Sequence, residues 1–211
     1  MKCLVNKSGR SLTDGVSLLK NELATAKLIQ FNFDVRLQSE LRAMQMSLDR
    51  VITPYSFFCK INLPQSPHIV SPLDLQLPTD GSYESEGSNV NYFLGHGHHK
   101  LAQIDNWQNG SIHNYNLFGI NDRLVSHDEF DENGQKRIHE VANSEGKIVY
   151  TEFLNKTQLP AIELYKTNGS ESIRLTRYND HSWDFDTKKD FFDFFVKELQ
   201  KQYVNCDLKE I

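Results

Sequence analysis

Histidines form the densest group of chemically capable side chains in this sequence. Three fall within residues 96–99, and the next two in the chain complete the candidate group of His96, His98, His99, His113 and His127. Neutral imidazoles are good zinc ligands, and adjacent histidines in a β-loop could share a metal. However, His98 and His99 point to opposite faces of a strand, and no carboxylate stands at a characteristic spacing. We therefore predict surface or edge-strand histidines and no metal site.

Basic and aromatic residues gather in the second half of the chain. The candidates for contact with a ligand are Arg137, His139, Lys147, Tyr150, Tyr165, Arg174 and Arg177, with Tyr178 beside them. Such mixed strand tips could meet an anionic or sugar-bearing acceptor, although a solvated strand face is the more frequent explanation. The net charge of -5 argues against a nucleic-acid partner, because phosphate contacts need clustered Lys and Arg.

The three cysteines, Cys3, Cys59 and Cys206, show no pairing typical of a metal site. A free cysteine is usually a small buried hydrophobe, so Cys59 and Cys206 are weak candidates for a nucleophile. The sequence contains neither a signal-peptide core nor a long apolar run. We expect no transmembrane segment and a cytoplasmic location, with peripheral contact at the inner face of the membrane left open.

The elements that must position these residues begin with a series of strand-like segments from about residue 91 to residue 185. Four glycines, Gly110, Gly134, Gly146 and Gly169, close turns at nearly regular spacing, and three of them follow an asparagine. Asn-Gly is the strongest short hairpin signal and favours a primed two-residue turn. Because the segments between the turns are rich in β-branched and aromatic residues, the pattern predicts an antiparallel meander.

The N-terminal third shows a different pattern. Strand candidates at 1–6 and 27–33 alternate with helical periodicity around 14–23 and 37–48. This order favours the start of a parallel, doubly wound sheet, but two strands are too few to bury both of its faces. The apolar stretch 51–61 is expected to be buried. The fold class is α+β, a mixed α/β protein with a partial base and a large antiparallel insertion.

Prolines and a Phe-rich segment delimit the rest. The four prolines between 64 and 78, followed by a polar and acidic run, predict a linker over 63–90. The segment from Thr187 to Asp190 resembles a capping box and predicts the N-terminus of a helix. The phenylalanines after it predict that this helix has about four turns and an exposed apolar surface. The predicted domains are a base of 1–62 with 186–211 and a β-insertion of 91–185.

The order of these parts resembles one protein family. A strand with a Gly-containing loop (Ser8 to Gly15) leads to Tyr55-Ser56-Phe57-Phe58, then to the meander phrases at 130–134 and 143–150, and last to 190–195. This layout is similar to the N-terminal half of bacterial family 4 glycosyltransferases with an inserted extended β-sheet, such as those that modify wall teichoic acid, poly(glycerol phosphate) or adhesins. It also resembles accessory-Sec glycosyltransferase subunits.

The resemblance implies a GT-B architecture, with a Rossmann-like acceptor-side domain and a second domain that binds the nucleotide sugar. In such enzymes the paired glutamates lie in that second domain, so no catalytic residue is assigned here. Ser8, Gly9 and Gly15 match the Gly-containing loop that approaches the donor phosphate, although Gly9 and Gly15 are separated, and a plain strand-to-helix turn is the alternative. No cofactor is expected, and a UDP-sugar donor only if the second domain is present.

Two functions remain open. The chain is either the acceptor-recognition portion of a glycosyltransferase acting on a cell-wall polymer or adhesin, or a separate non-catalytic interaction subunit that docks on a catalytic glycosyltransferase. In both cases we predict that the isolated chain is inactive. The partners are then a catalytic partner or the missing C-terminal half, and a glycopolymer or protein acceptor. Self-association is left open, and the Phe-rich helix is expected to contribute to docking.

Overall fold

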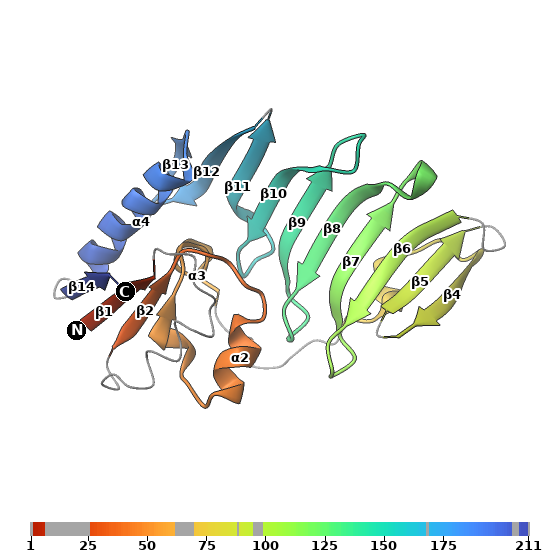
Figure 1. The fold of residues 1–211 in the computed structure, drawn as a ribbon, viewed down its shortest axis with the longest axis horizontal. Coiled ribbons are helices and arrows are strands. Elements are labelled where there is room, and N and C mark those ends of the chain that lie inside the picture. The colour runs from red at the N-terminus through yellow and green to blue at the C-terminus, as the bar shows by residue number, and fades with distance from the viewer. Residues whose placement is uncertain are drawn as a thin grey trace.

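The computed structural model describes residues 2–6, 26–61, 70–87, 89–94, 99–167, 169–203 and 207–210. Its strands form a ten-stranded antiparallel sheet and a four-stranded parallel sheet. Figure 1 shows the larger sheet running along the length of the molecule, with the smaller sheet and the helices gathered at one end of it. We call the parallel sheet with its helices the base, and the ten-stranded sheet the meander.

The meander confirms the predicted antiparallel sheet, since each strand pairs with its neighbours in sequence from β4 to β13. Its strands are β4 (Gly81–Glu86), β5 (Asn89–Leu94), β6 (His99–Asn106), β7 (Ile112–Phe118), β8 (Leu124–Phe130), β9 (Lys136–Ala142), β10 (Ile148–Leu154), β11 (Pro160–Thr167), β12 (Ser170–Tyr178) and β13 (His181–Phe185). From β7 to β11 each strand begins 12 residues after the one before it. The central meander is thus a regular repeat of strand and turn.

The turns differ from the predicted primed type. Gly134 and Gly146 have φ of +75° and +80°, but the residues before them do not have positive φ, whereas a primed type I turn needs it at both central positions. The first turn residue supplies the reason. Asp131 accepts hydrogen bonds from the backbone N–H of Asn133 (2.9 Å) and Gln135 (3.0 Å), which stabilises an Asx-type turn that ends in a left-handed residue.

The turn between β10 and β11 departs from this pattern at its last position. Gln158 stands where the two preceding turns have Gly134 and Gly146, and its φ is +61°. A residue with a side chain costs about 1–2 kcal/mol in the left-handed region, and glycine avoids this cost. Glycine also makes the unfolded chain more flexible, which offsets part of the gain. We therefore expect Gln158→Gly to raise the free energy of unfolding by about 0.5–1 kcal/mol. Urea denaturation measures the change. Gly146→Ala, the reverse exchange, should be destabilising, and a destabilised Gln158→Gly variant would contradict the argument.

The base is built on a parallel sheet in the order β14-β1-β2-β3. Its strands are β1 (Lys2–Asn6), β2 (Lys27–Gln30), β3 (Val51–Ile52) and β14 (Asp207–Glu210). The first two were predicted, and two further strands bring the sheet to four. The predicted helix over 14–23 lies outside the described residues, and the likeness of this unit to a Rossmann domain remains a prediction.

Three α-helices are described, each in the base. The predicted helix over 37–48 is shorter, α2 (Leu37–Ala43), and residues 48–50 form a 3-10 turn. The stretch 51–61 contains α3 (Pro54–Cys59), which begins at Thr53, whose hydroxyl accepts from the Ser56 N–H at 2.9 Å. The predicted Phe-rich helix is α4 (Lys188–Gln202), capped by Thr187. None of the helices in these described ranges is long and apolar enough to cross a membrane.

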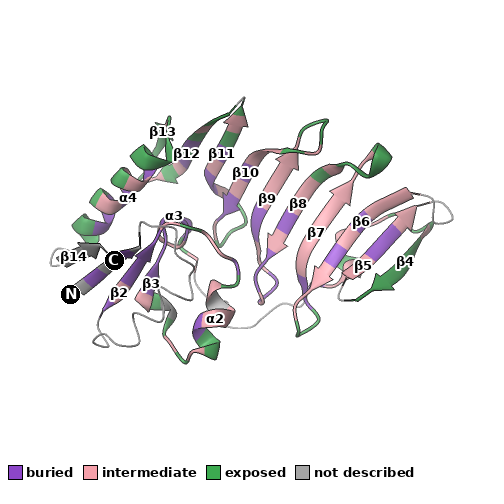
Figure 2. Cartoon of the chain, in the orientation of Figure 1, coloured by how far each residue is buried: buried purple, intermediate pink, exposed green. Residues whose placement is uncertain are grey.

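One hydrophobic core joins base and meander. Val5 and Ile29 of the parallel sheet, together with Tyr55 and Phe58 of α3, pack in the same cluster as apolar residues of β9 to β12. The prediction that the Phe-rich helix exposes its apolar surface is wrong, because Phe191 and Phe195 are 0% exposed. Figure 2 shows buried positions in the strands of the base and in the meander strands beside it. Helix α4 therefore packs into the core between the meander and the base.

The predicted linker is partly wrong. Residues 81–86, expected as a loop, form β4, an edge strand that pairs with β5 alone. An edge strand has one neighbour and exposes its side chains, so a polar, acidic composition suits it. Upstream, Val70, Leu75 and Leu77 pack against β6 and β7 through Ile104 and Ile112. The domain boundaries themselves remain predictions.

The described cysteines are inert for chemistry. Cys3 is disulfide-bonded. Cys59 is free and buried, and its thiol donates to the Phe153 carbonyl at 3.9 Å. Burial raises the pKa of the Cys59 thiol to about 12, so the reactive thiolate is scarce at neutral pH. Cys59 therefore acts as a small core residue.

Candidate functional site

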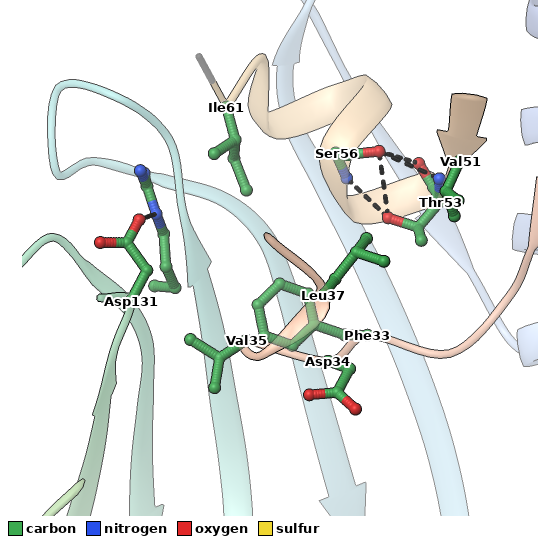
Figure 3. Close-up of a pocket in the computed structure, with 10 residues that line it drawn as sticks. Phe33, Asp34, Val35, Leu37, Val51, Thr53, Ser56, Ile61 and Asp131 are labelled. Carbon is green, nitrogen blue, oxygen red and sulfur yellow. Dashed lines mark hydrogen bonds and ion pairs between the residues drawn. The ribbon is translucent and has the colours of Figure 1, made fainter. Parts of the chain in front are cut away.

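A cavity lies where the carboxyl ends of β2 and β3 meet the turn between β8 and β9. In open α/β sheets, ligands bind at this edge of the strands. The cavity measures about 90 Å³ and is lined by Phe33, Asp34, Val35, Leu37, Val51, Thr53, Ser56, Ile61, Asp131 and Arg137. Figure 3 shows residues after β2, the start of α3 and Asp131 of the meander around this space. We call it the edge cavity.

An ion pair forms the meander wall of the edge cavity. Arg137 Nε donates to Asp131 Oδ2 at 2.8 Å, and the two side chains are only 3% and 2% exposed. Asp131 is held in place because its other oxygen accepts the two turn N–H groups described above. The β8–β9 pairing shifts register between Glu129 and Phe130, directly before the turn that holds Asp131.

One nitrogen of this pair has no partner. Arg137 Nη1 is buried and makes no hydrogen bond, and leaving a buried donor unsatisfied costs about 1–3 kcal/mol. Asp131 already balances the charge of the guanidinium. An uncharged acceptor oxygen, such as a hydroxyl or carbonyl of a ligand, can therefore satisfy Nη1 without burying a second uncompensated charge.

The remaining polar side chains of the edge cavity already have hydrogen-bond partners. Asp34 accepts from Arg36 Nε at 3.2 Å, and the hydroxyls of Thr53 and Ser56 lie 3.1 Å apart in the cap of α3. The apolar residues of the lining supply a wall. Because ligand pockets usually measure roughly 300–1,000 Å³, the edge cavity can hold one small hydroxylated group and not a whole nucleotide sugar.

A second polar surface lies on the face of the meander that points away from α3 and α4. Cross-strand partners there run Asp128–His139–Glu152–Glu163–Arg174–Asp184, with Tyr150 opposite Tyr165 in the adjacent row. The two tyrosine rings lie 4.9 Å apart. The hydroxyl of Tyr150 lies 2.8 Å from Glu152 Oε1 and 2.6 Å from Glu163 Oε1. We call this surface the outer platform.

The outer platform combines ring faces with hydrogen-bonding groups. Burial, followed by the hydrogen bonds to Glu163 and Glu152, raises the pKa of Tyr150 far above its usual range, so its hydroxyl stays protonated. Arg174 is held by Asp184 at 2.7 Å in an exposed ion pair. Aromatic faces beside carboxylates and a guanidinium can contact a hydroxylated ligand through both apolar and hydrogen-bonding groups.

The structure separates the predicted acceptor-binding residues into four places. His139, Tyr150, Tyr165 and Arg174 share the outer platform, whereas Arg137 is buried at the edge cavity. Two others lie elsewhere. Lys147 forms an exposed ion pair with Glu145 in a turn. Arg177 lines a separate hollow beside α3 with residues 155–157.

Several residues of the edge cavity were not predicted. Asp131 and Phe33 carry no motif, and their meeting depends on the packing of the meander against the base. The spacing of Asp131 three residues before Gly134 signals a turn but not an ion pair. The predicted donor-loop residues Ser8, Gly9 and Gly15 lie outside the described residues.

His99, His113 and His127 lie beside separate carboxylates. The nitrogen–oxygen distances are 3.9 Å for His99 to Asp122, 3.4 Å for His113 to Asp105 and 3.3 Å for His127 to Glu129. Among the described residues, no three His, Cys, Asp or Glu side chains lie together in a metal-binding arrangement. His96 and His98 lie outside the described ranges.

His139 should make stability depend on pH. Its hydrogen bond to Asp128 (2.6 Å) is the main cause that raises its pKa. Because the pKa of His139 is higher in the folded state than in the unfolded state, where it is about 6.5, protonation of His139 stabilises the fold. This stabilisation is complete at a pH below the unfolded-state pKa and is lost as pH rises through the folded-state pKa. We expect the free energy of unfolding to fall over this window, and to fall less in His139→Gln. Urea denaturation at several pH values tests this, and an identical slope in both proteins would contradict it.

Comparison with known proteins shows the fold. No family model and no curated protein matches this sequence. Solved structures do match. The Glycosylation Associate Protein (Gap123) complex from Streptococcus agalactiae matches 100% of this chain with a TM-score of 0.77 and 10% identity, over 47% of its own matching chain. The chain therefore spans less than half of that protein.

Two further matches are glycosyltransferase structures. The GtfA/B complex bound to UDP and GlcNAc matches 95% of this chain and 42% of its own, with a TM-score of 0.69 and 16% identity. A variant of TarM from S. aureus, in complex with fondaparinux, α-GlcNAc-glycerol and UDP, matches 94% and 43%, with a TM-score of 0.63 and 13% identity. The chain has a glycosyltransferase-like fold.

Proposed function

We propose that this chain is the acceptor-recognition portion of a GT-B glycosyltransferase of the family 4 type. Its acceptor is a cell-wall polymer or an adhesin, and its nucleotide-sugar half is carried elsewhere. The observation that carries the proposal is the edge cavity at the carboxyl edge of the parallel strands, which is lined by Arg137, a residue with a buried nitrogen that has no hydrogen-bond partner. The similar structures support it, because each is about twice as long as the part that this chain matches.

In this proposal the acceptor contacts two surfaces. A hydroxyl of the acceptor enters the edge cavity and accepts from Arg137, while further sugar or backbone groups contact the outer platform through Tyr150, Tyr165 and Arg174. Ser8, Gly9 and Gly15 remain the proposed contact with the donor phosphate. We propose a cytoplasmic location for the protein.

A second candidate is a non-catalytic subunit that docks on a catalytic glycosyltransferase. One observation favours it, since the matches include a glycosylation-associated complex and the GtfA/B complex. The neighbouring coding sequence discriminates between the two. A continuation with a nucleotide-binding half supports the first candidate, and a separate complete transferase beside this gene supports the second.

We expect the isolated chain to transfer no sugar. Catalysis needs groups placed to stabilise the departing diphosphate, and the edge cavity of about 90 Å³ is too small for the donor. Calorimetry with UDP-GlcNAc and UDP-glucose should show no binding, and incubation with donor and acceptor should give no product. A saturable micromolar donor isotherm would contradict this prediction and would make the loop at Ser8 to Gly15 the centre of the mechanism.

Acceptor binding tests the proposed function directly. The probes are a glycerol-phosphate oligomer and a serine-rich peptide, titrated into the full chain in the absence of donor. Val35 is 8% exposed and lines the edge cavity, so Val35→Phe should fill the cavity and abolish binding while leaving the Arg137–Asp131 pair intact. Val125→Phe, at an exposed position of β8, is the matched control. Binding that survives Val35→Phe unchanged would contradict the assignment.

A further inference from the structure

Two rows of polar side chains cross the half of the meander that the base does not cover. They lie on the face whose other half packs against α3 and α4. Cross-strand pairing aligns Glu84, Asn91, Gln103, Asn116, His127 and Glu140 in one row, and Glu86, Asn89, Asp105, Asn114 and Glu129 in the other. We call them the acid–amide rows.

The composition of the rows changes where the base ends. Glu129 is followed across the sheet by Ile138 and then Phe153, both of which belong to the core shared with the base. The rows themselves contain five carboxylates, five amides and one histidine, and no Lys or Arg. The apolar half of this face is explained by its contact with the base. The charged side chains of the acid–amide half are carboxylates, and packing against the base does not require them.

Asn91 provides an independent sign that a partner is missing. It is 6% exposed, and its Nδ2 donates to Glu86 Oε2 at 3.2 Å. This bond orients the amide, and Asn91 Oδ1 is left buried without a hydrogen-bond donor. Native proteins rarely leave such a group unsatisfied, so Asn91 Oδ1 indicates that a hydrogen-bond donor is missing at the rows.

We propose that the acid–amide rows bind a lysine- or arginine-bearing segment of a protein partner. Ammonium and guanidinium groups carry donors and no acceptors, which matches rows of carboxylates and amide oxygens. A second copy of this chain is disfavoured because its net charge is -5, and nucleic acid is repelled by the same carboxylates. None of the row residues lines the edge cavity, so this inference does not depend on acceptor binding there.

Binding of a ten-residue lysine peptide to the full chain tests the proposal. We expect saturable binding, measured by fluorescence anisotropy, that weakens as salt rises. Glu86→Gln with Glu129→Gln should weaken binding at least fivefold. Glu145→Gln with Asp180→Asn makes the same change of charge at exposed turns outside the rows, and should weaken it less than twofold. Equal losses in the two double variants would overturn the proposal, because binding would then follow net charge alone.

Two further readouts locate the peptide. Carbodiimide coupling joins carboxylates to lysine amines, so peptide mapping should find cross-links at Glu84, Glu86 or Glu129. Asn91→Leu removes the unpartnered oxygen without changing the charge, and replacing a poorly satisfied polar group by an apolar one is close to neutral for stability. It should weaken peptide binding with no loss of stability. Cross-links confined to the outer platform, or full binding by Asn91→Leu, would contradict the assignment.

Discussion

Replacing Arg137 by methionine is expected to lower the free energy of unfolding by about 3–5 kcal/mol, the usual cost of removing one partner from a buried ion pair. Arg137 and Asp131 are 3% and 2% exposed, and their atoms lie 2.8 Å apart. Without the guanidinium, the carboxylate stays in the turn that it organises, because its other oxygen accepts two backbone N–H groups. The charge is then buried without compensation. Urea denaturation followed by circular dichroism measures the change.

Arg174→Met is the matched control for this experiment. It breaks an ion pair of similar geometry, 2.7 Å from Asp184, in which both side chains are exposed, and such surface pairs contribute about 0–1 kcal/mol. Combining Arg137→Met with Asp131→Asn should recover part of the lost stability, because the amide keeps the turn acceptor and removes the buried charge. A loss in Arg137→Met no larger than in Arg174→Met would show that the pair is not buried as described.

Phe195→Ala should cost about 3–5 kcal/mol, as expected for deleting a fully buried aromatic side chain. Phe195 is 0% exposed, and the centroid of its ring lies 5.5 Å from that of Phe57 and 6.0 Å from that of Phe58. The truncation leaves a cavity between α4, α3 and the meander. Since this cluster holds the two sheets together, near-UV circular dichroism should change along with the unfolding midpoint.

A control on the surface separates this effect from the loss of apolar area in general. Ile120 is 82% exposed, so Ile120→Ala should change stability by no more than about 0.5 kcal/mol. If Phe195→Ala lost less than about 1 kcal/mol, the site would have to collapse easily around the missing ring. The helix would then not be the main attachment of the meander to the base.

Local signals account for the elements that were predicted correctly. Gly134 and Gly146 end turns that Asp131 and Asn143 organise through their own side chains, so each hairpin is encoded by a few consecutive residues. Thr187 caps α4 in the same way, by accepting from the Asp190 N–H at 3.1 Å. Features of this kind need no information from distant parts of the chain.

The errors arose where a residue's surroundings come from distant segments. The acidic strand β4 was expected to be a loop because an edge strand exposes polar side chains that also suit a loop. Arg137 was placed with His139 on a solvent-facing tip, yet packing against the base buries it. Phe191 was expected at the surface because its partner Phe58 is far away in sequence.

The edge cavity could not be predicted from local sequence patterns for the same reason. Phe33, Thr53 and Asp131 come from the base and the meander, and no spacing rule connects them. The outer platform was partly predictable, since alternation along a strand places Tyr150 and Glu152 on one face. Its partners on the neighbouring strands depend on register, which the turns determine.

The two sheets differ in how early they can form during synthesis. Each meander strand pairs with the strand just made, so hairpins can add one at a time at little entropic cost. The parallel sheet is different, because Lys2 of β1 pairs with Asp207 of β14. Until α4 emerges, β12 of the newly made meander lacks the helix that packs against it, which leaves Leu175 open to solvent. A nascent chain at this stage should therefore be a target for chaperones that recognise apolar sheet faces.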